Sequence, residues 1–145
     1  MVNSQDIYSV AKSLASRNEK ASNRSSISRA YYASFHKGLE FFRMYGVDIP
    51  EKSEAHQDLI YCFNNTGIEK ISNLGSKFGD MRTLRTKADY KLSDPNSESN
   101  GTVLDALDWA KEIIDGLSPL SDEEKTKLRS TLKTWNDTSK KLKLR

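Results

Sequence analysis

Apolar residues recur at helical spacing along almost the whole chain. Between Asn3 and Arg17 they repeat at i, i+3, i+4, i+7 and i+8, and the positions between them are mostly polar. This period is typical of an amphipathic helix with one face against a core. No stretch of useful length alternates as a strand does, so we expect an all-α, up-and-down bundle of four to six helices. The same spacing predicts the other helices over about 23–45, 53–63, 68–90 and 102–117 and from 121 onward.

Capping residues and turn formers mark where these helices end. Gly46 can adopt the left-handed conformation that terminates the helix before it. Ser53 and Thr102 are expected to cap the helices that follow them. Residues 91–101 are dense in turn formers, and they form the one long loop that we expect.

The predicted core is assembled from the inward stripes of these helices. Gly75 and Gly79 each weaken their helix by roughly 1 kcal/mol, which predicts a kink or a close helix contact near them. The apolar fraction is only 36%, and charged residues make up 30% of the chain. We therefore expect a single domain over 1–145 with a thin core that dimerisation supports. The expected core residues are Ile27, Tyr31, Phe35, Phe42, Leu59, Phe78, Leu107 and Ile114.

Basic residues concentrate at the C-terminal end. The formal net charge of the whole chain is +3, which permits nucleic acid as a partner. From Lys125 to Arg145, eight Lys or Arg residues stand against the single acid Asp137. Two interpretations of the basic helix and tail over 121–145 stay open: a solvated, partly frayed segment, or a segment that contacts RNA.

Cysteine use and hydropathy indicate a cytoplasmic protein. Cys62 is the only cysteine, so an intramolecular disulfide is excluded and a reducing compartment fits. It lies in an apolar run, where we interpret it as a buried structural thiol rather than a reactive one. No apolar segment reaches about 18 residues, and Met1–Asp6 lacks the apolar region of a signal peptide, so we expect no membrane partner.

One face of the helix over 23–45 carries candidate chemistry. Arg29, His36 and Arg43 are spaced seven apart and form a line, with Tyr32 and Leu39 beside it. A purely solvated face does not require aromatic residues. On the helix over 68–90, Arg85 falls within the apolar stripe, so its guanidinium is expected to point into the fold, a cleft or a partner.

These residues carry a resemblance to a known family. The run Ser28-Arg29-Ala30-Tyr31-Tyr32-Ala33-Ser34-Phe35-His36 resembles the Ser-Arg-x-Tyr-Tyr-Ala-x-Phe-His pattern on the long helix of small stand-alone bacterial members of the HEPN superfamily. A second family element, Arg followed by Ala-Asp-Tyr, is matched over Arg85–Tyr90. The resemblance covers about 3–120. It implies a HEPN-like helical domain, homodimerisation, and a toxin–antitoxin or antiviral-defence role with a nucleotidyltransferase-like partner.

The resemblance also implies metal-independent cleavage of RNA. Related HEPN proteins use an Arg and a His with four to six residues between them, usually from both chains of a dimer, and Arg29 and His36, with six residues between them, match this spacing at its upper limit. In the nucleolytic members the motif generally lies on the later helix, where this chain has Arg85 followed by Tyr90. We therefore name Arg29, His36, Arg85 and Tyr90 as catalytic candidates and expect them to converge on one cleft. A histidine with a pKa of about 6.5 can move protons at neutral pH, while arginine stabilises charge on a phosphate.

Other residues on the same two helices are expected to contact RNA or a nucleotide. No metal or cofactor is expected, because His36 and His56 lie on different helices and no ligand spacing accompanies them. His56, at the start of its helix, is interpreted as an ordinary surface residue. The expected RNA- or nucleotide-binding residues are Tyr32, Arg43, Arg82, Lys87 and Asp89.

Structural roles for the same residues stay open. Arg29 can pair with Glu40 or Asp89, and Arg85 can pair with Asp89 at i, i+4 on its helix. His36 can hydrogen-bond across a helix contact, and both tyrosines can be core rings whose hydroxyls find partners. The alternative to an endoribonuclease is a non-catalytic HEPN module that binds RNA, a nucleotide or a partner protein.

Overall fold

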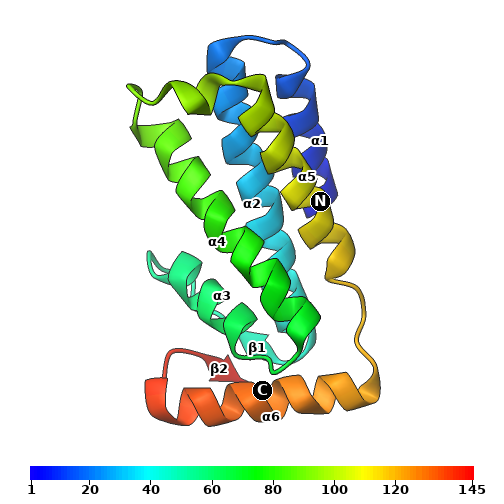
Figure 1. Ribbon diagram of the computed structural model, residues 1–145. Coiled ribbons are helices and arrows are strands. Elements are labelled where there is room, and N and C mark those ends of the chain that lie inside the picture. Colours follow the sequence, from blue (N-terminus) through cyan, green and yellow to red (C-terminus); the bar gives the residue numbers. More distant parts are fainter.

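The computed structural model describes residues 1–145 and is mostly helical. Four long helices, α1, α2, α4 and α5, run side by side up and down the molecule, α3 packs low on one side, and α6 crosses the lower end (Figure 1). The expectation of a helical bundle is confirmed. No helix combines the length and the apolar character needed to cross a bilayer. The elements are α1 Ser4–Ala15, α2 Lys20–Met44, β1 Val47–Asp48, α3 Ala55–Asn64, α4 Glu69–Tyr90, the 3-10 turn η1 Pro95–Glu98, α5 Asn100–Gly116, α6 Asp122–Ser139 and β2 Lys143–Leu144.

The bundle is built around α2, which packs against α1, α3, α4 and α5. All predicted core residues except one are buried. The exception is Ile114, which is only partly buried, while its neighbour Ile113 is fully buried. The reason is periodic: on α5 the buried positions are 103, 106, 107, 110 and 113, and 113 continues the i+3 step from Ala110.

Helix ends follow the capping chemistry, with two corrections. Gly46 has a φ of +81° directly after α2, as predicted. The cap of α5 is Ser99 rather than Thr102, because the Ser99 hydroxyl accepts the backbone N–H of Thr102 at 3.1 Å. Ser53 does not cap α3, because its hydroxyl donates to the Glu54 carboxylate and the helix begins at Ala55.

The close helix contact expected near the glycines of α4 is present at Gly75. A Cβ placed on Gly75 would lie 2.5 Å from the Cβ of Phe63 on α3, far inside van der Waals contact. A Cβ on Gly79 would meet no atom within 4 Å. Only Gly75 is therefore needed for α3 and α4 to approach each other.

The C-terminal tail folds back, which does not fit a frayed segment, one of the two interpretations that the sequence leaves open. Lys140 adopts a left-handed conformation with a φ of +53°, and the Asn136 side chain bonds to both backbone groups of Leu142. The chain then pairs antiparallel with β1, with Val47 opposite Leu144. Arg129 of α6 links the end of α2 to the last residue of the chain, because its guanidinium donates to the carbonyls of Tyr45 and Arg145. The two-stranded sheet is the only departure from an all-helical structure.

The long loop is held by Arg24, a residue that the sequence did not single out. Its guanidinium donates to carbonyls at the C-terminal end of α4 and in the loop, including Ala88 at 3.0 Å and Asp94 at 2.8 Å. It also lies 3.6 Å from the Glu98 carboxylate. The bond to Ala88 satisfies one of the last four carbonyls of α4, which have no partner within the helix.

Candidate functional site

Two arginines from different helices meet at one tyrosine ring. The Arg29 guanidinium lies 5.0 Å from the Tyr32 ring centroid on α2, and the Arg85 guanidinium reaches the same ring from α4 at 5.6 Å. Arg85 also lies 5.1 Å from the ring of Tyr31. All three distances are within the range of cation–π attraction. We call Arg29, Tyr32, His36 and Arg85 the Tyr32 cluster.

Arg85 is the most unusual member of this cluster. It is only 8% exposed, and its Nε–H has no hydrogen-bond partner. The expected i, i+4 pair with Asp89 exists but is long, at 3.9 Å, and that carboxylate also accepts the Ser28 hydroxyl at 3.1 Å. A buried cation with an unsatisfied donor is costly unless an anion supplies the missing bonds. The environment of Arg85 therefore suits an anionic ligand.

His36 lies on the exposed side of α2, one turn after Tyr32. Its ring centroid is 6.5 Å from that of Tyr32 and 5.4 Å from that of Phe35. Partial burial lowers the pKa of His36, and the positive charge of Arg29 lowers it further. The imidazole is thus neutral at pH 7 and can accept a proton.

His56 belongs to the site, which corrects its interpretation as ordinary surface. Its ring stacks on Phe35 at 4.4 Å, and its Nδ1 lies 2.6 Å from the Tyr31 hydroxyl. Burial raises the pKa of Tyr31, so the phenol keeps its proton at neutral pH, and the His56 tautomer decides which of the two groups donates in this hydrogen bond. The sequence held one signal for this contact, because a buried tyrosine hydroxyl requires a polar partner.

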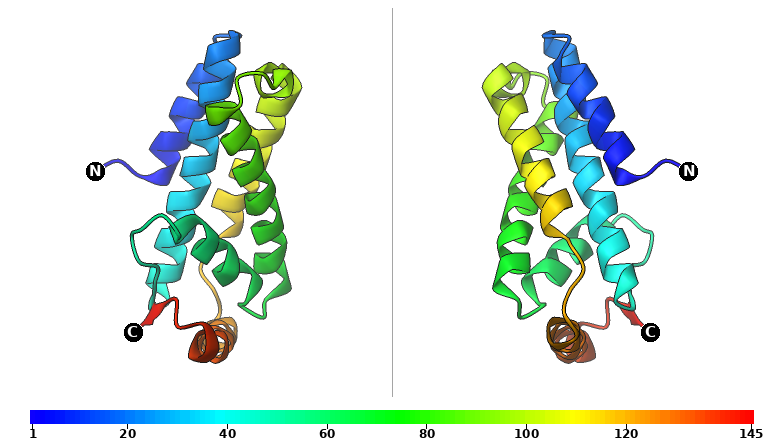
Figure 2. Two further views of the ribbon diagram at one scale, coloured as in Figure 1. Left: turned by 90° about the vertical axis from the view of Figure 1, so that its left-hand side faces the viewer. Right: turned by 90° about the vertical axis from the view of Figure 1, so that its right-hand side faces the viewer.

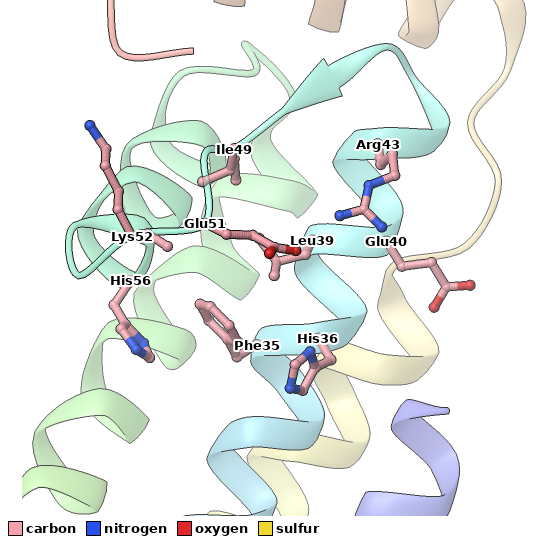
Figure 3. Close-up of a pocket in the computed structure, with 10 residues that line it drawn as sticks. Phe35, His36, Leu39, Glu40, Arg43, Ile49, Glu51, Lys52 and His56 are labelled. Carbon is pink, nitrogen blue, oxygen red and sulfur yellow. The ribbon is translucent and has the colours of Figure 1, made fainter. Parts of the chain in front are cut away.

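Both histidines border one hollow of about 440 Å³ between the second half of α2 and the segment from β1 into α3. Figure 3 shows His36 and His56 on either side of Phe35 at one end of this hollow. Burial lowers the pKa of His56, and the charges of Arg85, Arg82 and His36 add to the effect. The hollow therefore has two neutral imidazoles at its rim at pH 7.

The remaining candidates are placed in different surroundings. Tyr90 is 77% exposed at the last residue of α4, more than one turn beyond Arg85, so the expectation that it would join the others is wrong. Arg43 borders the hollow and lies 3.8 Å from the Asp48 carboxylate. Arg82 donates to the Gln57 side chain at 3.0 Å. Lys87 is exposed on α4.

The contacts of Arg29 and Cys62 show which of their possible structural roles the fold adopts. The neighbour of Arg29 is the Tyr32 ring rather than Glu40 or Asp89. Cys62 is fully buried, and burial together with the nearby Asp58 raises its thiol pKa, as expected of an unreactive core cysteine. No group of three or more His, Cys, Asp or Glu side chains is arranged to hold a metal ion.

Comparison of the chain with protein-family models, with curated proteins and with solved structures finds no match in any of the three. The HEPN resemblance thus rests on the two sequence elements given above, and it stays a prediction.

The histidine environments predict how stability depends on pH. Burial lowers the pKa of both His36 and His56, so each binds its proton more weakly in the folded chain than in the unfolded chain. The free energy of unfolding should therefore have its full value above about pH 6.5 and fall as the pH drops below that value. Urea unfolding between pH 7.5 and 5 measures this. His56→Gln should flatten the profile, and an equally steep profile in that variant would contradict the assignment.

Proposed function

We propose that this chain acts on RNA at the Tyr32 cluster as a metal-independent endoribonuclease. The observation that carries the proposal is the buried Arg85, whose Nε–H has no partner and whose ion pair with Asp89 is long. An RNA phosphate beside the cluster would pair with the charge of the Arg85 guanidinium, which Asp89 compensates only at 3.9 Å. Arg29, exposed and directed to the same ring, offers a second guanidinium to that phosphate.

The chemistry follows from the position of His36. Its neutral imidazole accepts the proton of an RNA 2′-hydroxyl, and the 2′ oxygen attacks the phosphorus atom held by the arginines. A 2′,3′-cyclic phosphate forms, the bond to the 5′ oxygen breaks, and the departing oxygen takes a proton from water. The arginines stabilise the charge that builds on the phosphate oxygens. His56 stacks on Phe35, and the Tyr31 ring lies against the Arg85 guanidinium, so these two residues hold Phe35 and Arg85 in place.

The test is cleavage of single-stranded RNA in the presence of a chelator. His36→Ala should reduce the cleavage rate by about 100-fold or more, because it removes the proton acceptor. Its affinity for RNA should stay within about threefold of the wild-type value, because the arginines remain. The control is Lys37→Ala, which alters the next residue on α2 and should cleave normally. If His36→Ala cleaves RNA at the wild-type rate, the catalytic assignment is overturned.

A second candidate function is RNA or nucleotide binding without cleavage. It is favoured because the His36 ring contacts the rings of Tyr32 and Phe35 and has no hydrogen-bond partner, whereas a catalytic histidine is usually oriented by a partner group. Under this alternative the wild type binds RNA through the same arginines and releases no product, and His36→Ala changes nothing.

The biological setting of the proposal comes from the resemblance alone. It suggests a cytoplasmic homodimer in a toxin–antitoxin or antiviral system, restrained by a nucleotidyltransferase-like partner protein. A two-fold dimer would bring a second exposed Arg29 and His36 to one cleft.

A further inference from the structure

The hollow beside His36 is not used by the phosphate and proton chemistry above. Its floor is apolar: Phe35, Ile49 and Ala55 are each less than a tenth exposed, and Leu39 packs beside them. A volume of about 440 Å³ is ample for a flat heterocyclic base and lies within the range of small-molecule sites. The hollow adjoins the Tyr32 cluster because His36 borders it.

Two opposite charges reach over this floor. Figure 3 shows the Glu51 carboxylate lying beside Leu39 and the Arg43 guanidinium extending from α2 toward the same space. The ion pair of Arg43 with Asp48 is long, at 3.8 Å, and the Arg43 side chain is 57% exposed, so the guanidinium is free to donate to a ligand. The hollow thus presents a pair of acceptor oxygens next to a cationic donor.

We propose that this hollow is a guanine subsite for the RNA whose phosphate lies at the Tyr32 cluster. The base rests on the apolar floor, Glu51 accepts the N1–H and the 2-amino N–H, and Arg43 donates to O6. The inference rests on the proposed function, since it names the base next to the bound phosphate.

Guanine is the RNA base whose Watson–Crick edge fits this pattern. That edge carries two adjacent donors followed by one acceptor, which matches a carboxylate beside a guanidinium. Adenine and cytosine place a ring acceptor next to their single amino group, so a carboxylate would face a lone pair. Uracil has one N–H between two carbonyls and leaves the second carboxylate oxygen unpaired.

The spacing along α2 agrees with a single nucleotide. Leu39 lies seven residues after Tyr32, which is about 10 Å along the helix, and His36 lies between them. This is comparable with the reach of one nucleotide from its phosphate to the far edge of its base. The proton acceptor is therefore positioned between the phosphate site and the base site.

The experiment compares short labelled oligouridylates that contain one guanine, one inosine or one adenine, by fluorescence anisotropy. We expect wild type to bind the guanine oligomer at least about tenfold more tightly than the adenine oligomer, with inosine between them because it lacks the 2-amino group. Glu51→Gln should lower guanine affinity to the adenine level. The matched control is Glu40→Gln, since Glu40 borders the hollow but directs its carboxylate away from it (Figure 3).

The outcomes separate this inference from the proposed function. Equal binding of all three oligomers, with affinity still dependent on Arg85, would overturn the guanine subsite and leave the phosphate site standing. If no oligomer binds, the proposed function fails, and titration with guanosine and adenosine monophosphates tests the hollow alone. Equal or absent binding of the two monophosphates would then overturn the subsite as well.

Discussion

Replacing Arg85 by methionine is expected to weaken RNA binding by about tenfold to a hundredfold without lowering the stability of the fold. The variant removes a charge-assisted contact to phosphate, and hydrogen bonds to charged groups contribute about 1.5–3 kcal/mol each. In the free protein the same guanidinium is 8% exposed, with an unpartnered Nε–H. Methionine fills a similar volume and packs well against the two tyrosine rings.

A loss of RNA affinity without a loss of stability distinguishes a ligand site from a structural one. Fluorescence anisotropy measures the affinity, and urea unfolding measures the free energy of unfolding, which should change by less than about 1 kcal/mol or rise. Arg17→Met, which alters an exposed arginine beyond α1, is the control and should bind RNA nearly as wild type does. A stability loss above about 2 kcal/mol with unchanged RNA affinity would show that Arg85 serves the fold.

Gly75→Ala is expected to lower the free energy of unfolding by about 2 kcal/mol. The new Cβ would lie 2.5 Å from the Phe63 Cβ and 3.1 Å from its Cγ, so α3 and α4 must move apart. The displacement would also reach the site, because Phe63 packs on Phe78 and Phe78 stacks on Tyr31 at 5.1 Å.

Gly79→Ala on the same helix provides the matched control. Its Cβ enters open space, so the gain in helix propensity should raise the free energy of unfolding by up to about 1 kcal/mol. Thermal unfolding of both variants beside wild type measures the difference. A stabilising Gly75→Ala would mean that the contact between α3 and α4 is looser than described.

The features that the sequence predicted correctly depend on the residues close by in the chain, above all on the helical spacing of apolar positions. The stripe on α2 placed Tyr31 and Phe35 in the core, and the position of Arg85 within the apolar stripe of α4 predicted an inward guanidinium. Gly46 was a correct prediction for the end of α2, because a glycine adopts the left-handed conformation that ends a helix, and this depends only on local sequence. The shift from Ile114 to Ile113 shows the limit of this approach, since two adjacent isoleucines fit a helical stripe almost equally well.

The features that sequence missed depend on partners far along the chain. The contacts of His56, Tyr31 and Phe35, lie on another helix, so its local sequence indicates only a surface position. Arg24 donates to carbonyls more than sixty residues later in the sequence, and no local sequence pattern predicts such a hydrogen bond. The basic composition of the tail is compatible with a frayed segment or an RNA contact, whereas its pairing with β1 depends on where that distant segment lies in the fold.

An RNA phosphate is expected to occupy the space beside Arg85. The most direct measurement is the arginine side-chain Nε–H spectrum of the uniformly 15N-labelled wild-type protein, titrated with a short single-stranded RNA, with the Arg85 signal assigned from Arg85→Lys. We expect the Arg85 and Arg29 signals to shift together and to saturate, while the Arg17 signal stays in place. Binding of RNA that leaves the Arg85 signal unmoved would contradict the account.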